Sequence, residues 1–211
     1  MKHLSNAREV FDIEIDALKY LRDRIDNSFE NTIELFLDCI KNRGKIIITG
    51  VGKSGLIGRK IAATLTSTGA TSVVLDTVDA LHGDIGIVND GDVLLILSYS
   101  GETEEIKSLL PVLKRFKVKI VSMTASTKST LAKYSDIILN VRIPREACPF
   151  NLVPTSSTTA MLALGDALAI GLLKAIGLKK EDYARFHPAG AIGKTLLLKT
   201  ADIMRSGDRN P

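Results

Sequence analysis

The chain has 211 residues, of which 45% are hydrophobic and 25% charged, a balance typical of one soluble domain of ordinary size. Its net charge of +4 comes from 28 basic and 24 acidic residues scattered along the chain, so no basic run or helix face indicates a nucleic-acid partner. The N-terminus lacks the apolar core of a signal peptide, and no apolar run is expected to reach transmembrane length. We therefore expect a cytoplasmic protein with no membrane partner.

The first 44 residues are predicted to be helical. Apolar residues recur there at helical spacing, as in Ile13, Leu18, Leu21 and Ile25, and the sequence NRG at 42–44 is typical of a helix stop.

Five short apolar runs follow, separated by helix-like segments at about 53–67 and 102–116. Runs without polar alternation are typical of strands buried on both faces. The alternation of strands and helices predicts an α/β fold, a three-layer sandwich with a five-stranded parallel sheet. The runs lie at 45–50, 71–76, 92–98, 118–124 and 135–141, and a long helix at about 155–176 closes the domain.

Ligands of such sheets bind beyond the carboxyl ends of the strands, where a glycine turn follows the first strand. Residues 50–55 contain G-x-G-x-x-G, and residues 52–54 read GKS like the end of an ATP-binding P-loop. The P-loop is excluded because it needs a glycine where Ile47 stands. The dinucleotide fingerprint fits better, since Asp76 ends the next strand where a ribose-binding acid is expected. The alternative is that the glycines only permit a tight strand-to-helix turn. In both cases the free N–H groups at the start of the helix favour binding of an anion.

A second loop, SYSGETEE at 98–105, follows the third strand. Ser98, Ser100 and Thr103 bring three hydroxyls to a helix N-terminus, and Gly101 allows a close backbone approach. One hydroxyl would be an ordinary N-cap, whereas three within six residues favour binding of a terminal phosphate monoester. A dinucleotide site has no use for this second loop.

The long helix opens with five consecutive hydroxyl residues in PTSSTTA at 154–160. One suffices for capping, so the others indicate either a ligand role or a tight interface, and both alternatives stay open. Asp166, inside the same helix, is expected to be a structural acid. The two cysteines, Cys39 and Cys148, have no metal-ligand spacing, and we expect both to be buried thiols in a reducing compartment.

Few residues can serve acid–base chemistry, because the chain has three histidines. His3 lies in a terminal segment and is set aside, while His82 and His187 lie in loops, where a surface role is the alternative to catalysis. Glu146 follows the fifth strand, between two prolines. Two more candidates are Glu105, one turn into the helix after the serine loop, and Lys53, which suits either an ion pair or a cation for phosphate.

Six segments together resemble a known family. GVGKSGLIGRKIAATLTSTG, LHGDIG, SYSGETEEI, REACP, PTSSTTAMLALGDALA and HPAGAIGKTLLLK occur in this order. They are similar to the D-arabinose 5-phosphate isomerases of the sugar isomerase (SIS) domain family, over about residues 14–211. The resemblance implies a flavodoxin-like parallel sandwich and the interconversion of D-ribulose 5-phosphate and D-arabinose 5-phosphate through an enediol. That activity supplies synthesis of the sugar acid Kdo for lipopolysaccharide or capsule.

The resemblance also implies roles for particular residues and a set of partners. It implies homotetramers whose sites are shared between subunits, with His187 as a residue contributed by a neighbour. It implies a sugar phosphate as the ligand and no cofactor or metal, which leaves only adventitious zinc binding at His82. The implied catalytic residues are Lys53, His82, Glu105, Glu146 and His187; the phosphate-binding residues are Ser54, Ser98, Ser100 and Thr103; and further substrate contacts are Gly52, Thr155, Ser156 and Ser157. His82 and Glu146 are not ranked as the group that moves the carbon-bound proton.

The domain plan follows from the same resemblance. Residues 1–44 are expected to be N-terminal helices of the same domain, 45–197 the SIS domain, and 198–211 a linker into a truncated pair of CBS domains. The chain departs from the family pattern at Leu56, where histidine is common, at Phe186, and at DTVDA (76–80), where many members have HPxEA.

Two alternative functions remain at this stage. SIS domains also act as non-catalytic sugar-phosphate sensors in transcription regulators, but the segment before Lys45 is too short for a helix-turn-helix domain as well as the SIS helices. The other alternative is an isomerase that acts on a different sugar phosphate.

Overall fold

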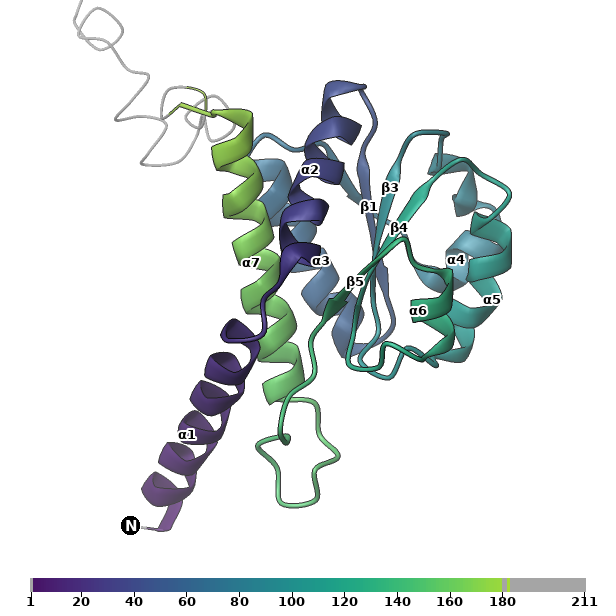
Figure 1. Ribbon diagram of the computed structural model, residues 1–211. Coiled ribbons are helices and arrows are strands. Elements are labelled where there is room, and N and C mark those ends of the chain that lie inside the picture. The colour runs from purple at the N-terminus through teal and green to yellow at the C-terminus, as the bar shows by residue number, and fades with distance from the viewer. Residues whose placement is uncertain (1, 180–181, 183–211) are drawn as a thin grey trace, which may run out of the picture.

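The computed structural model describes residues 2–179 and 182, and it has three layers (Figure 1). A five-stranded parallel sheet with the strand order β2-β1-β3-β4-β5 lies between two layers of helices. The order reverses between β1 and β3, as in flavodoxin-like folds, which places a ligand crevice at the carboxyl ends of these strands. The predicted α/β fold class is confirmed. The strands are β1 (Ile46–Gly50), β2 (Ser72–Val74), β3 (Val93–Leu97), β4 (Lys119–Thr124) and β5 (Ile137–Asn140), each inside a predicted run.

Four long helices cover one face of the sheet or pack on that layer. They are α1 (Lys2–Arg22), α2 (Asn27–Lys41), α3 (Lys53–Ser67) and α7 (Ser156–Ile176). The Asp26 carboxylate starts α2 by accepting the N–H of Ser28 at 2.9 Å. Asp166 of α7 pairs with Lys60 of α3, which confirms its expected structural role.

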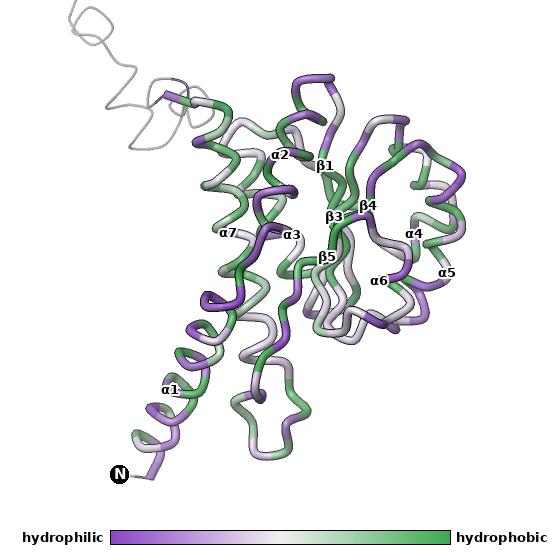
Figure 2. The backbone as a smooth tube through the Cα atoms, viewed as in Figure 1, coloured by the Kyte–Doolittle hydropathy of each residue, from purple (hydrophilic) through white to green (hydrophobic). Residues whose placement is uncertain are grey.

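Short helices cover the opposite face. They are α4 (Thr77–Leu81), the 3₁₀ turn η1 (Asp84–Ile87), α5 (Glu104–Leu113) and α6 (Thr130–Tyr134). The sheet is therefore buried on both sides, which explains why its strands lack polar alternation. Ile46 and Ile48 belong to the core under α7, whereas Ile47 belongs to the core under α5. Figure 2 shows the hydrophobic strands running through the centre of the molecule.

Helix α7 is long and apolar enough, by length and composition, to cross a membrane, which corrects the expectation that no run has this length. It packs against α1, α2 and α3, and Leu164, Leu168 and Leu172 are buried in the core. Part of its apolar surface is thus buried in the domain core.

Two other sequence expectations have different outcomes. Cys39 is buried as expected, but Cys148 is only partly buried, because it lies in the long loop between β5 and α7. His187 and the predicted linker at 198–211 lie outside the described residues.

Candidate functional site

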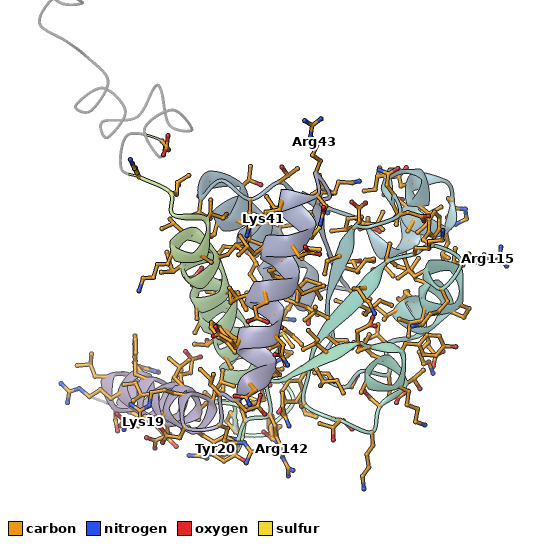
Figure 3. All side chains as sticks on the ribbon, turned by 45° about the horizontal axis from the view of Figure 1, so that its top comes forward. Lys19, Tyr20, Lys41, Arg43, Arg115 and Arg142 are labelled. Atoms are coloured by element: carbon orange, nitrogen blue, oxygen red, sulfur yellow. The ribbon has the colours of Figure 1, made fainter. Side chains whose placement is uncertain are left out.

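The candidate site lies at the carboxyl edge of the sheet. In Figure 3, Lys41 and Arg43 mark the opposite, amino edge just before β1, and Arg142 marks the carboxyl edge just after β5. Loops after β1, β3 and β5 meet at this carboxyl edge, and each carries predicted site residues.

The glycine turn joins β1 to α3 through two residues, Val51 and Gly52. Gly52 has a φ of +58°, which glycine adopts without strain, and no side chain caps α3 at this residue. A Cβ on Gly55 would lie 2.5 Å from the carbonyl oxygen of Gly50, so the start of the helix lies directly against the end of the strand. The first N–H groups of α3 are therefore presented next to Lys53 and Ser54, as an anion site requires.

Asp76, the candidate ribose-binding acid, is the N-cap residue of α4. Its carboxylate accepts the N–H groups of Val78 at 2.9 Å and Asp79 at 3.4 Å, so it caps α4. Asp76 and Leu56, two positions where the chain departs from the family pattern, line a small cavity of about 150 Å³ beside the glycine turn.

The serine loop at 98–103 brings two of its three hydroxyl residues together. The hydroxyls of Ser98 and Thr103 share a hydrogen bond of 2.9 Å, and Ser98 Oγ accepts the N–H of Gly101 at 3.1 Å. Ser100 Oγ accepts the N–H of Glu102 at 3.2 Å. Thr103 occupies the N-cap position of α5, yet its side chain makes no capping bond. Its hydroxyl pairs with the hydroxyl of the buried Ser98 instead, unlike in an ordinary N-cap.

Glu146 is held by the first turn of α7. Its Oε2 atom accepts the N–H groups of Thr155 at 2.8 Å and Ser157 at 3.1 Å, together with the Thr155 hydroxyl at 3.1 Å. These donors and the positive end of the helix dipole stabilise the negative charge on Oε2. Among the described residues Oε1 accepts no hydrogen bond, so the second carboxylate oxygen of this 9%-exposed side chain is unused.

A cavity of about 330 Å³ connects these loops. Ser54, Tyr99, Glu146 and Ser157 line it, so it takes one or more residues from the glycine turn, the serine loop, the loop after β5 and the start of α7. Its size falls in the range of small-molecule sites. Ser156 does not line it, because the side chain is fully buried and its hydroxyl has no partner.

Three predicted catalytic residues lie outside the lining of this cavity. Lys53 is exposed at the start of α3, and His82 is exposed at the C-cap of α4. Glu105 is half-buried in the first turn of α5. Within the described residues no three His, Cys, Asp or Glu side chains are grouped as metal ligands.

Several residues that line the cavity were not predicted from the sequence. Tyr99 accepts the N–H of Ile143 at 3.3 Å on its hydroxyl, which links the serine loop to the loop of Glu146. Burial raises the pKa of Tyr99, and the Glu146 carboxylate raises it further, so the hydroxyl keeps its proton. Its place between two loop serines was the signal available in the sequence. The other residues not named beforehand include Arg145 and Thr158, which lie inside the segments REACP and PTSSTTA, and Asn151, which lies in no recognised motif.

An open parallel sheet with glycine and hydroxyl loops at its carboxyl edge defines an anion-binding α/β domain. Comparison with known proteins narrows this class. The SIS domain profile matches residues 39–171, and the chain belongs to the SIS domain family.

Curated and solved relatives agree with this assignment. Arabinose 5-phosphate isomerase KdsD of Francisella tularensis is 47% identical over 209 residues, which are 99% of this chain and 64% of the relative. The chain thus spans less than two thirds of that relative's length. The structure of an Escherichia coli CFT073 protein in complex with arabinose 5-phosphate has a TM-score of 0.85 at 35% identity, over 89% of this chain and 98% of the other. A putative phosphosugar isomerase involved in capsule formation, from Bacteroides fragilis, has a TM-score of 0.85 at 34% identity, with the same coverage.

Proposed function

We propose that this chain is the catalytic domain of an aldose–ketose isomerase that interconverts D-ribulose 5-phosphate and D-arabinose 5-phosphate. The observation that carries the proposal is that Tyr99 of the serine loop and Glu146 line the same cavity. One carboxylate oxygen of Glu146 accepts no hydrogen bond from the described residues. The name of the F. tularensis relative and the arabinose 5-phosphate bound to the E. coli protein support this substrate.

The phosphate group would bind at the serine loop. Ser98, Ser100 and Thr103 offer hydroxyl donors there, and the first turn of α5 adds N–H groups and a favourable dipole. Ser54, at the start of α3, lines the cavity and would contribute from the other side.

Glu146 is proposed to move the proton between C1 and C2. Its Oε2 is fixed by hydrogen bonds from the start of α7, which orient the carboxylate, and Oε1 would contact the substrate. Lys53 would stabilise the negative charge that develops on the enediolate oxygen. Glu105 or His187 would assist ring opening or transfer of the oxygen-bound protons.

Subunits of a homotetramer are proposed to share their sites. His82 is exposed and lies outside the cavity of its own chain, which suits a role in a neighbouring subunit. Exposed apolar side chains on α1 and on the loop beside the site support such an interface, because soluble proteins rarely leave so many uncovered. They include Leu4 and Phe11 of α1, and Phe150 and Leu152 of the loop, the last two at 80% and 78% exposure.

The proposed product would feed Kdo synthesis for lipopolysaccharide or capsule in the cytoplasm, with residues 198–211 leading into CBS domains. The test is isomerisation of ribulose 5-phosphate, followed in heavy water so that deuterium enters at C2 of the arabinose 5-phosphate formed. The same assay with other pentose and hexose phosphates identifies an isomerase of different specificity. Binding of a sugar phosphate without any exchange would indicate the sensor instead and overturn the proposal.

A further inference from the structure

Glu102 links the serine loop to a helix that carries none of the predicted site residues. Its Oε1 accepts the N–H of Thr130 at 2.7 Å, and its Oε2 accepts the hydroxyl of the same residue at 2.8 Å. Thr130 is the first residue of α6, the helix that follows β4 in the sequence. One side chain of the loop is thus bound twice to a single residue 28 positions away.

The neighbouring backbone reinforces this contact. The carbonyl of Gly101 accepts the N–H of Leu131 at 3.1 Å. Gly101 has a φ of +70°, and a Cβ there would lie 2.2 Å from the hydroxyl of Ser129. The loop therefore lies directly on the start of α6, and its middle is held from outside as well as by β3 and α5.

Glu102 places a negative charge in the loop that is proposed to bind phosphate. A carboxylate beside an anion site repels a bound phosphate, so it weakens binding unless it does something else. The hydrogen bonds to Thr130 direct both oxygens toward α6, and they hold the pKa of Glu102 below its ordinary value. Lys107 and Lys133 lower that pKa slightly further.

We propose that Glu102 is a positioning residue, which locks the serine loop through Thr130 in the conformation that receives a phosphate group. Without the tether, binding of phosphate must first order the loop, and the entropy of that ordering reduces affinity. The inference rests on the proposed function for the identity of the ligand, but it can be tested with inorganic phosphate alone.

Three variants separate the tether from the charge. Glu102→Ala removes both. Glu102→Gln removes the charge but keeps an acceptor for the Thr130 N–H and a donor toward its hydroxyl, which can reverse its role. Glu104→Ala is the matched control, because Glu104 is an acid two residues further on, in the first turn of α5, and its carboxylate pairs with Lys107.

The measurements are the dissociation constant of inorganic phosphate by calorimetry, and KM and kcat for ribulose 5-phosphate. For Glu102→Ala we expect the phosphate constant and KM to rise by about tenfold, as loss of two hydrogen bonds predicts, with kcat within about twofold. Glu102→Gln and Glu104→Ala should match the unmodified protein or bind phosphate slightly tighter.

Thr130→Val removes only the hydroxyl half of the tether, so we expect an intermediate rise in the phosphate constant. The proposal is overturned if Glu102→Gln is as impaired as Glu102→Ala, since the loss would then not come from the hydrogen bonds to Thr130 that the amide keeps. It is also overturned if Glu102→Ala binds phosphate normally, or if the unmodified protein binds none. Absence of isomerisation with intact phosphate binding would refute the proposed function and leave the tether test decisive.

Discussion

Oε2 of Glu146 accepts the backbone N–H of Thr155 at 2.8 Å, so the acid of the loop after β5 is fixed by the helix that follows it. Two segments that the sequence analysis treated separately, REACP and PTSSTTA, therefore form one unit. Thr155 of the second segment holds the carboxylate of Glu146 in the first. This is a structural role, in addition to the two alternatives of ligand binding and a tight interface.

Because α7 holds only one carboxylate oxygen of Glu146, we expect an isosteric substitution there to lower kcat strongly while changing the free energy of unfolding little. Glu146→Gln keeps an oxygen for the N–H groups of Thr155 and Ser157, so the free energy of unfolding should fall by less than about 1 kcal/mol. Loss of the proton-transfer group should reduce kcat by about 100-fold or more. Initial rates and urea unfolding of the same preparations measure both quantities.

Two further variants serve as controls. Glu146→Ala leaves the helix N–H groups unpaired and should cost about 1–3 kcal/mol in stability as well as activity. Asp166→Asn changes another acid of α7, paired with Lys60, and should keep near-normal activity. An active Glu146→Gln protein would rule out the proposed role.

The fold was predictable because its signals are local. Ile46 to Ile48 form an uninterrupted apolar run, and a strand covered by helices on both sides produces this pattern wherever it lies in the sheet. The contact between Ser98 and Thr103 in the serine loop was predictable for a similar reason, since the two residues are close in sequence and the contact needs only one turn.

The rest of the site depends on tertiary paths that no local pattern encodes. The tether between Glu102 and Thr130 crosses 28 residues, and it depends on how α6 packs after β4. The exposed position of His82 follows from where the short helix α4 ends, and motif spacing does not report that. Tyr99 lines the cavity because the loop after β5 and the start of α7 pack beside it, which no local pattern reports.

Gly101 is predicted to tolerate no side chain. In Gly101→Ala the methyl group would meet the Ser129 hydroxyl, at a φ of +70° that L-residues rarely adopt. We expect a loss of about 2–3 kcal/mol in the free energy of unfolding and a higher KM for the sugar phosphate. Gly86→Ala is the control, because a Cβ at Gly86 meets nothing within 4 Å. Equal unfolding curves for the two variants would contradict the close approach of the loop to α6.

The two cysteines are predicted to react at very different rates. Backbone N–H groups of Val153 and Leu152 donate to the Cys148 sulfur at 3.2 and 3.1 Å and lower its pKa, so more of this thiol is ionised near neutral pH. Burial, followed by the charge of Asp92, raises the pKa of Cys39 to about 11. Titration of the native protein with a thiol reagent should therefore show one fast thiol per chain.

The lowered pKa of Cys148 also predicts how its reaction rate with the thiol reagent changes with pH. Because the thiolate is the reactive form, the rate at Cys148 should rise with pH and level off below the pH at which an ordinary thiol does. Cys148→Ser should abolish the fast phase, and sugar phosphate should slow it if the loop of Glu146 closes on the ligand. A fast phase that survives in Cys148→Ser would show that Cys39 is accessible.

Sharing of sites between subunits predicts complementation. His82→Ala and Glu146→Gln should each be nearly inactive alone, and His82→Ala should fold normally because the side chain is exposed. When the two variants are co-expressed, some sites receive His82 from one subunit and Glu146 from another. Random pairing in a closed oligomer then restores roughly a quarter of the normal rate. Sedimentation gives the oligomeric state of the same sample. A mixture no more active than its parts would mean that His82 and Glu146 do not act in one shared site, and near-full activity of His82→Ala alone would remove this histidine from the mechanism.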